Sequence, residues 1–246
     1  MFEISQKLPR PVVYRLPQYL THVRELRQDG LEWISSHKLA DDLGLTSSTV
    51  RQDLSKLHMH GVSKRGYRIV QLEKALSDVL GAGRVHNAVI VGAGYLGTAL
   101  ALHGGLAEQG FKICGIFDSD PELMGAAVGS LRVQSMETLD YVVGTKCKAE
   151  IGIIAVPASS AQSVADLLID AGVRGLLNLA YTRILVPPGV ALMDARIIAN
   201  LQQLAYVIRN RNGKPAVSST GKSSGNRKKH PASNNLPGGI KRDIKI

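Results

Sequence analysis

The segment Val89–Gly97 has the sequence Val-Ile-Val-Gly-Ala-Gly-Tyr-Leu-Gly, in which an apolar run ends in a G-x-G-x-x-G turn. A helix-like run follows, and Asp118 lies 21 residues beyond Gly97, at the end of the next apolar run, residues 112–117. In this pattern the first glycine permits a tight turn, the second lets backbone N–H groups approach a pyrophosphate, and the third lets the helix pack closely. The helix N-terminus offers partial positive charge to the phosphates. The segment therefore predicts a strand–turn–helix unit that binds a dinucleotide.

Asp118 indicates which dinucleotide is preferred. A carboxylate accepts a hydrogen bond from a ribose 2′-hydroxyl and repels a 2′-phosphate, which favours NADH and NAD+ over their phosphorylated counterparts. The alternative is a glycine-rich turn without a ligand. The residues that we expect at the cofactor are Gly92, Ala93, Gly94, Tyr95, Leu96, Gly97, Asp118, Val156, Pro157, Ala158, Asn178 and Ala180.

Beyond Asp118 the sequence alternates between strand-like and helix-like segments. Strands separated by helices predict a parallel sheet that is covered on both faces, and ligands of such sheets bind at the carboxyl ends of the strands. We therefore expect a Rossmann-type doubly wound α/β domain. The predicted strands are residues 131–133, 151–156, 175–179 and 190–193, and the predicted helices are residues 136–143, 159–171 and 195–209.

The residues before the glycine turn predict a separate N-terminal domain of the winged helix-turn-helix class. Residues 16–28 place apolar side chains at helical spacing, residues 35–44 begin with a serine cap and end in glycine, and a third helix starts at Thr46 or Ser47. The basic segment 61–69 resembles the wing hairpin of such domains.

The third helix would be the recognition helix, whose N-terminal residues meet base edges in the major groove. The alternatives are a solvated helix face, or a winged helix that contacts only protein. We expect Ser47, Ser48, Thr49, Arg51 and Gln52 at base edges, and Ser55, Lys56, Lys64 and Arg65 at phosphates.

Charge is distributed unevenly along the 246 residues, which carry a formal net charge of +10. Residues 211–246 hold nine Lys or Arg against one Asp and contain few apolar side chains, so we expect a disordered basic tail. Such a tail would add non-specific affinity for DNA or only solubilise the chain. We find no run of 18 apolar residues and no N-terminal signal pattern, which predicts a cytoplasmic protein. The two cysteines and seven histidines have no metal-ligand spacing, so we expect ordinary buried thiols and no metal.

Taken in order, these segments resemble the Rex family of redox-sensing transcriptional repressors. The family is bacterial, and the resemblance implies a homodimer that binds an inverted-repeat operator in double-stranded DNA and releases it when NADH occupies the Rossmann domain. The segments that carry the resemblance are Tyr14–Pro17, Val50–Ser55, Lys64–Tyr67, Gly92–Leu100, Phe117–Pro121, Val156–Ala158 with Ala161 and Gln162, Asn178–Ala180 and Asn200–Leu204.

The resemblance also implies three segments: a winged-helix domain (1–78), a Rossmann domain (79–194) and a domain-swapped dimerisation helix (195–210). The composition adds the disordered basic tail (211–246) as a fourth. Arg15, His103, Asp194 and Arg196 are the residues that we expect to couple the two domains. Two of them depart from the family pattern, which usually has tyrosine in place of His103 and aspartate in place of Arg196. Because an Arg15–Arg196 pair would repel, Asp194 is the candidate substitute for the missing acid.

Two other functions are consistent with the same residues. One is a constitutive DNA-binding protein whose Rossmann domain serves only dimerisation. The other is an NAD-dependent oxidoreductase, with His103 and Tyr95 as its only acid–base candidates. Neither His103 nor Tyr95 is accompanied by a Lys–Tyr or His–Asp arrangement at a spacing that would indicate catalysis, so we expect a regulator and not an enzyme.

Overall fold

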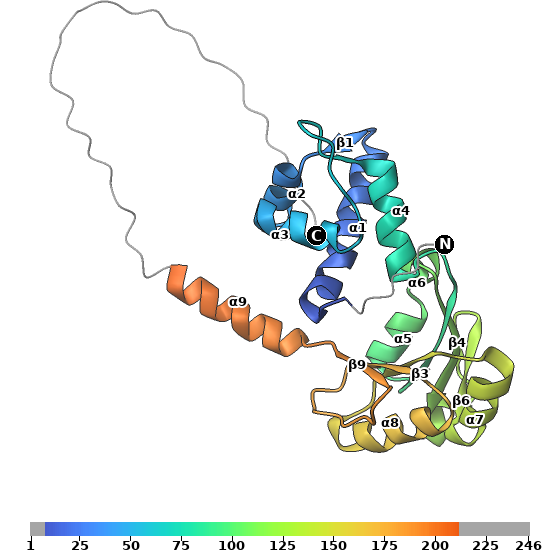
Figure 1. Ribbon diagram of the computed structural model, residues 1–246. Coiled ribbons are helices and arrows are strands. Elements are labelled where there is room, and N and C mark those ends of the chain that lie inside the picture. Colours follow the sequence, from blue (N-terminus) through green and yellow to red (C-terminus); the bar gives the residue numbers. More distant parts are fainter. Residues whose placement is uncertain (1–7, 212–246) are drawn as a thin grey trace, which may run out of the picture. The chain divides into compact units, whose positions relative to one another are not determined.

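The structure, a computed structural model, describes residues 8–211 (Figure 1). The predicted basic tail lies outside the described residues except for Arg211. The N-terminal domain pairs a small antiparallel sheet with a group of helices, which confirms the predicted winged helix-turn-helix. Its elements are α1 (Arg10–Gln28), β1 (Trp33–Ile34), α2 (Ser36–Asp42), α3 (Ser47–Ser55), β2 (Tyr67–Arg68) and α4 (Ile69–Leu80).

Capping side chains set the starts of the two helices of the helix-turn-helix. The Ser35 hydroxyl accepts the backbone N–H of Lys38 at the start of α2, and the Thr46 hydroxyl accepts the N–H of Thr49 at the start of α3. Each bond satisfies a helix N–H that has no partner within the helix. The predicted starts of both helices are therefore confirmed.

The first helix is longer than the predicted range of residues 16–28, because it begins at Arg10. Pro11 stands at the N-terminal end, where a missing N–H costs nothing, while Pro17 lies inside the helix and removes one backbone hydrogen bond. Val12 and Leu16 are both buried in the core of the domain. Because Leu16 already lies in the predicted range, it is Val12 that extends the apolar face, by about one turn toward the N-terminus.

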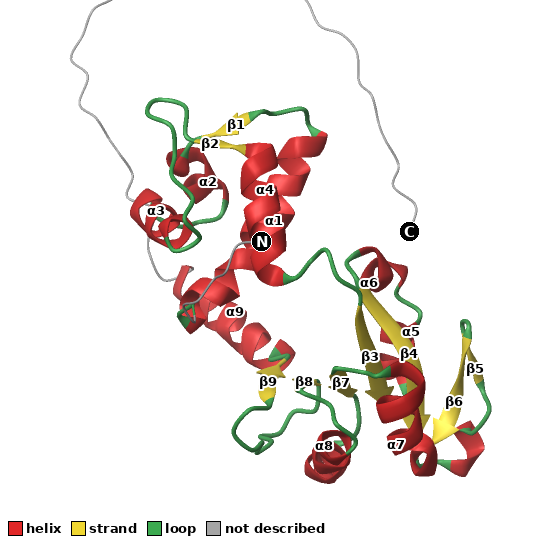
Figure 2. Ribbon diagram, turned by 45° about the vertical axis from the view of Figure 1, so that its right-hand side comes forward, coloured by secondary structure: helices red, strands yellow, loops and turns green. Residues whose placement is uncertain are grey.

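The second domain contains a seven-stranded sheet in the order β5-β6-β4-β3-β7-β8-β9, parallel except for β5 (Figure 2). The strand order reverses between β3 and β7, as in doubly wound folds, so the predicted Rossmann-type class is confirmed. The short antiparallel strand β5 was not predicted. The strands are β3 (His86–Val91), β4 (Phe111–Asp118), β5 (Ala127–Val128), β6 (Leu131–Ser135), β7 (Ile151–Ile154), β8 (Gly175–Asn178) and β9 (Ala191–Asp194).

Alternating side chains of β3 pack into two apolar layers, one on each face of the sheet. Val89 and Val91 join the cluster that includes α8, and Ile90 joins the cluster on the opposite face. A strand buried on both faces in this way occupies the centre of a parallel sheet. The helices of this domain are α5 (Tyr95–Ala101), α6 (Gly104–Glu108), α7 (Leu139–Tyr141) and α8 (Ala161–Asp170), with a π-helical turn at Val142–Cys147 and 3₁₀ turns at Pro121–Leu123, Met136–Thr138 and Ala158–Ser160.

The last helix, α9 (Ile197–Arg211), follows β9. From Leu201 to Asn210 every residue is exposed, including the apolar Leu201, Leu204, Val207 and Ile208. The helix therefore carries apolar side chains that the described part of this chain does not cover. None of the helices described between residues 8 and 211 has the length and apolar character needed to cross a membrane.

Candidate functional site

The turn between β3 and α5 requires glycine at two of its three glycine positions. Gly92 has φ of +106°, and a Cβ there would lie 2.4 Å from the carbonyl oxygen of Ala155. A Cβ on Gly97 would lie 1.9 Å from the carbonyl oxygen of Gly92. Both contacts are far shorter than van der Waals distance, so these glycines are needed for the turn itself.

Gly94 differs from the other two glycines because no atom lies within 4 Å of the position that its Cβ would occupy. It is the N-cap of α5, with extended backbone and no side chain that caps the helix. The N–H groups at this helix end therefore have open space in front of them. That arrangement suits a pyrophosphate, which would approach the backbone where a side chain would otherwise stand.

Asp118 ends β4 beside the same turn. Its Oδ2 accepts the backbone N–H of Ala93 at 2.6 Å, and its Oδ1 accepts the N–H of Asp120 at 3.0 Å. Each carboxylate oxygen has a second lone pair, so the group can still accept hydrogen bonds from ribose hydroxyls. The residues present thus fit a dinucleotide at this edge of the sheet.

The remaining predicted cofactor residues follow the carboxyl ends of neighbouring strands. Val156, Pro157 and Ala158 come after β7, which pairs with β3, and Ala180 comes after β8. In the turn itself, the Tyr95 and Leu96 side chains are exposed at the start of α5.

Asn178, also predicted at the cofactor, is buried at the end of β8. Its Nδ2 donates to the carbonyl oxygen of Thr182 and to Asp194 Oδ1, both at 2.9 Å, and its Oδ1 accepts the N–H of Ala180. These bonds use both of its donors, so Asn178 organises the loop after β8.

Most of the predicted DNA contacts on α3 and the wing are exposed. Ser48, Arg51 and Gln52 are exposed, whereas Thr49 is half-buried, with its hydroxyl and backbone N–H engaged by Thr46 in the cap of α3. Ser47 is half-buried at the start of the same helix. At its other end the Ser55 hydroxyl donates a hydrogen bond to the carbonyl oxygen of Gln52, and the next residue, Lys56, is exposed.

The wing is a tight turn closed by a bridge between Val62 and Gly66. Gly66 has φ of +86°, and a Cβ there would lie 2.2 Å from the carbonyl oxygen of Ile34, so the wing returns close to β1. Lys64 is exposed at the turn, and the guanidinium of Arg65 lies 5.7 Å from the centre of the Trp33 ring. This cation–π contact orients Arg65 while its charge stays accessible.

Sequence reasoning missed a buried polar network inside the N-terminal domain. Asp53 of α3 accepts two hydrogen bonds from Arg15 and one from the Tyr19 hydroxyl. Burial, with the hydrogen bond to Asp53, raises the pKa of Tyr19 well above its ordinary value, and the hydrogen bond to Asp53 raises the pKa of Arg15. The available signal was the place of Asp53 on the inward face of α3, between the predicted core positions Val50 and Leu54.

The four predicted coupling residues lie at these places. Arg15 is held by Asp53. Arg196 lies 3.4 Å from Asp194, which also accepts from Asn178, and His103 is the N-cap residue of α6. The expected role of these residues in coupling the domains stays a prediction.

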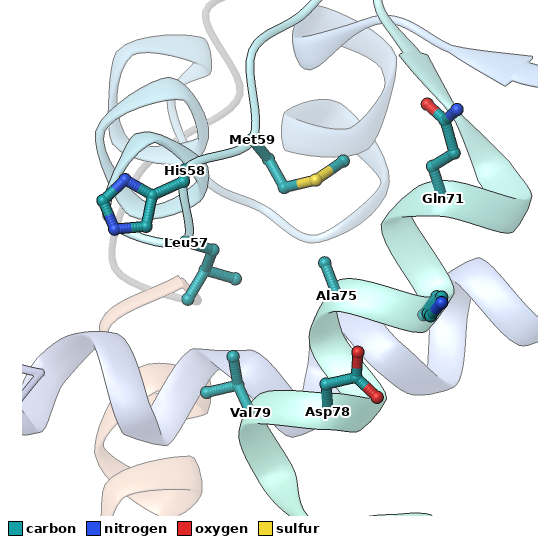
Figure 3. Close-up of a pocket in the computed structure, with 8 residues that line it drawn as sticks. Leu57, His58, Met59, Gln71, Ala75, Asp78 and Val79 are labelled. Carbon is teal, nitrogen blue, oxygen red and sulfur yellow. The ribbon is translucent and has the colours of Figure 1, made fainter. Parts of the chain in front are cut away.

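Part of the surface described for residues 8–211 is hollowed away from the predicted contacts, in two places. One, of about 340 Å³, lies between α4 and the segment after α3, where Leu57 and Met59 face Ala75 and Val79 (Figure 3). The other, of about 410 Å³, is lined by apolar side chains of the sheet, among them Phe111, Ile153 and Met193. None of the predicted cofactor or DNA residues lines either cavity.

The two cysteines, which we expected to be ordinary buried thiols, are free and half-buried. The Cys147 thiol donates to the carbonyl oxygen of Cys114 at 3.6 Å. Burial raises the pKa of Cys114 to about 12, which keeps that thiol protonated at neutral pH.

Comparison with known families matches the two domains separately. Residues 7–55 match the family model described as "Putative DNA-binding protein N-terminus", and residues 84–182 match the one described as "CoA binding domain". The first ends at the last residue of α3, and the second contains the glycine turn, Asp118 and the strands up to β8.

Several solved structures share the whole architecture. RSP, a Rex-family repressor solved in complex with β-NAD+ and operator DNA, is 31% identical with a TM-score of 0.79, and the match covers 84% of this chain and 95% of that one. Its complex with β-NADH has a TM-score of 0.77 and the same identity, over 84% of this chain and 97% of that one.

Similar sequences extend over most of the chain. The redox-sensing transcriptional repressor Rex of Thermotoga petrophila is 40% identical over 210 residues, which are 85% of this chain and 100% of that protein. The repressor of the same name from Roseiflexus sp. (strain RS-1) is 38% identical over 200 residues, 81% of this chain and 90% of that protein. With this identity over both domains, the chain belongs to the Rex family of redox-sensing transcriptional repressors.

Proposed function

We propose that this protein is a DNA-binding transcriptional repressor that senses the NADH/NAD+ ratio and releases its operator when NADH binds the Rossmann domain. The observation that carries the proposal is the open space at Gly94 beside Asp118, in a chain whose other domain presents an exposed recognition helix. Relatives at 38–40% identity that bear the name redox-sensing transcriptional repressor support it, as do the complexes of RSP with cofactor and operator DNA.

The cofactor would lie across the carboxyl ends of β3, β4 and β7. The α5 N-terminus and the backbone around Gly94 would hold the pyrophosphate, and Asp118 would accept hydrogen bonds from the adenosine ribose. The segment Val156–Ala158 follows the strand next to the turn and would border the nicotinamide end. The nicotinamide is the only part that differs between the reduced and oxidised forms, so the response must arise there.

DNA would be bound through α3 and the wing. Ser47, Ser48, Thr49, Arg51 and Gln52 are the proposed base-edge residues. Ser55, Lys56, Lys64 and Arg65 are the proposed phosphate contacts. All of these residues belong to one helix and one hairpin of a single small domain. One copy of the protein would therefore cover one half of an inverted repeat.

A homodimer follows from the same proposal, since a two-fold symmetric operator calls for two copies of the domain. The exposed apolar residues of α9, with Leu201 and Leu204 among them, supply a surface that a second copy would bury. We therefore propose residues 195–210 as a domain-swapped dimerisation helix. We likewise propose residues 1–78 and 79–194 as the two domains.

Signal transfer between the domains would involve Arg15, His103, Asp194 and Arg196. NADH must prefer one domain arrangement over the other, by roughly 5.5 kcal/mol for a change from 99% bound to 99% released. Asp194 remains our candidate for the acid that the family usually has at position 196; in this structure it lies beside Arg196 and accepts a hydrogen bond from Asn178.

We propose that the protein is a regulator without enzymatic activity, acting in the cytoplasm, where a bacterial chromosome lies. The Tyr95 side chain is fully exposed at the start of α5, and the His103 side chain makes no capping hydrogen bond in α6, whereas a proton relay needs a titratable group that a second one holds in place. Turnover of NADH with any substrate would contradict this part of the proposal.

Transcription in a purified system tests the proposal. A promoter that overlaps an inverted repeat, selected by the protein from random DNA, should be repressed by the protein with NAD+ and transcribed again when NADH replaces it. Coenzyme A is the matched control ligand, because it also carries an adenosine pyrophosphate and a family model with its name matches residues 84–182. Repression that NADH leaves unchanged would contradict the sensing role, and relief by coenzyme A alone would reassign the ligand.

A further inference from the structure

The recognition helix α3 carries a charged side chain on its buried face. Asp53 is only 2% exposed and lies between the fully buried Val50 and Leu54. Its Oδ2 accepts Arg15 Nε at 2.6 Å and its Oδ1 accepts Arg15 Nη2 at 2.8 Å, so the guanidinium grips both oxygens. The Tyr19 hydroxyl donates to Oδ2 at 2.8 Å. Every donor comes from α1, so this network joins the recognition helix to α1.

An ion pair around a buried carboxylate is a poor way to gain stability. The Arg15 side chain is 25% exposed but that of Asp53 is only 2% exposed, and withdrawing such a carboxylate from water offsets much of the attraction within the pair. An apolar pair of similar volume is often as stable or more so. Such a pair does constrain geometry, because its hydrogen bonds hold only over a narrow range of distances and angles. The network therefore restricts how α3 can be placed on α1.

The apolar neighbours of Asp53 restrict the helix less. Methyl groups of Val50 and Leu54 keep contact with a core when a helix turns by several degrees, since dispersion and hydrophobic contacts have little direction. A planar guanidinium that binds both oxygens of a carboxylate allows much less rotation. Asp53 is thus the residue on α3 that defines its angle about its own axis.

That angle determines where the neighbouring exposed side chains point. Arg51 and Gln52 immediately precede Asp53 and are both exposed. With side chains a helix has a radius of about 5–6 Å, so a rotation of about 20° moves their outer atoms by about 2 Å. Such a displacement exceeds the tolerance of a bidentate hydrogen bond to a base edge.

We propose that Asp53, held by Arg15 and Tyr19, is a positioning residue that sets the rotation of the recognition helix and thereby the sequence specificity of DNA binding. Asp53 contacts no base in this account; it acts through Arg51 and Gln52. The inference rests on the proposed function, because it requires that α3 bind DNA.

Three variants separate this role from a merely structural one. Asp53→Asn keeps the size of the side chain and one acceptor oxygen but loses the charge and the second oxygen that the guanidinium grips. Tyr19→Phe keeps the ring in the core and removes one hydrogen bond. Leu72→Ala is the control, because Leu72 is a fully buried residue of α4 in the same core and takes no part in the hydrogen bonds of the network, so its truncation lowers stability and leaves those bonds in place.

The readout is the ratio of affinities for the selected inverted-repeat duplex and for a scrambled duplex, measured on the full chain at a temperature where each variant is folded. We expect Asp53→Asn to lower this ratio by about tenfold and Tyr19→Phe by about threefold, whereas Leu72→Ala changes it less than about twofold. If Asp53→Asn and Tyr19→Phe lose affinity for the selected and the scrambled duplex equally, so that the ratio changes no more than in Leu72→Ala, the inference is overturned. Tyr19→Phe keeps the test decisive if Asp53→Asn does not fold.

A double-mutant cycle checks that Asp53 acts through Arg51. Arg51→Ala should weaken operator binding strongly in the wild-type chain and much less in the Asp53→Asn chain, since the arginine is already misdirected there. Independent effects that simply add would contradict the inference. If the wild-type chain itself binds the selected and scrambled duplexes equally, the proposed function fails as well; if it prefers the selected duplex and the variants keep that preference, only this inference fails.

Discussion

Asp118 Oδ2 and the backbone N–H of Ala93 form a hydrogen bond of 2.6 Å, which ties the acid at the end of β4 to the glycine turn after β3. The second oxygen is held by the N–H of Asp120 at 3.0 Å. The carboxylate is therefore oriented before any ligand arrives. Such preorganisation lowers the entropic cost of binding a ribose at this place.

Asp118→Asn should weaken NADH binding and reduce the preference for NADH over NADPH. The amide keeps a hydrogen-bond acceptor for Ala93 but removes the negative charge that repels a 2′-phosphate. We expect NADH affinity to fall by about tenfold, the effect of losing one hydrogen bond to a charged group. Titration calorimetry with both nucleotides gives the two affinities. Asp120→Asn is the matched control, and an unchanged NADH preference in Asp118→Asn would contradict the assignment of Asp118.

Alanine at two glycines of the turn should have opposite effects on folding and binding. Gly97→Ala places a Cβ 1.9 Å from the Gly92 carbonyl oxygen, so it should lower the free energy of unfolding by at least about 2 kcal/mol. Gly94→Ala meets no protein atom within 4 Å. Its stability should change by less than about 0.5 kcal/mol while NADH affinity falls by about tenfold, because the methyl group stands where the pyrophosphate approaches.

Thermal unfolding and NADH fluorescence measure the two quantities for each variant. Gly104→Ala is a suitable control, since its added Cβ would also meet open space but it lies outside the glycine turn. Wild-type NADH affinity in folded Gly94→Ala would show that the cofactor does not use this turn.

Arg51→Ala and Lys64→Ala should affect DNA binding in different ways. Arg51 is expected at a base edge, so its loss should cost about 1–3 kcal/mol on the operator and little on scrambled DNA. Lys64 is expected at a phosphate, so its loss should weaken binding to every duplex and lower the salt dependence, the slope of log K against log salt, by about 0.9. Binding titrations from low to moderate salt distinguish the two, and identical behaviour of both variants would refute the division into base and phosphate contacts.

Folding stability should depend on Tyr19 at alkaline pH. Burial and the Asp53 carboxylate raise the pKa of Tyr19 above its ordinary value. A tyrosine in the unfolded chain loses its proton at about pH 10, whereas folded Tyr19 keeps its proton at that pH. Above that pH the unfolded state therefore binds fewer protons than the folded state, and the free energy of unfolding falls as the pH rises. Tyr19→Phe should show a shallower decline than the wild-type chain in denaturant melts above that pH. Tyr14→Phe, which alters an exposed tyrosine, should decline like the wild type.

Local sequence patterns predicted most of the fold, because each pattern depends on a contact that a residue within the pattern itself makes. The caps of α2 and α3 depend on hydroxyls at Ser35 and Thr46, and the turn after β3 depends on Gly92 and Gly97. These are short-range requirements, visible in any stretch of sequence that meets them.

Features that depend on distant residues were not predictable in the same way. The start of α1 at Arg10 depends on core positions for Val12 and Leu16, and the pairing of Arg15 with Asp53 joins residues 38 positions apart. In the same way, the sequence suggested Asn178 as a cofactor residue, but its hydrogen bonds to Thr182 and Asp194 become evident only once β8 and β9 are side by side.

Fluorescence anisotropy of the labelled, selected inverted-repeat duplex, titrated with the full-length protein at a fixed and stated salt concentration, tests the central claim most directly. The three conditions are no cofactor, NAD+ and NADH, with scrambled DNA as a control for non-specific binding by basic segments. The account predicts that NADH weakens binding to the selected duplex by about tenfold or more, or about 1.4 kcal/mol, while NAD+ does not. Equal affinity for that duplex with NADH and NAD+ would contradict it and would favour a constitutive DNA-binding role.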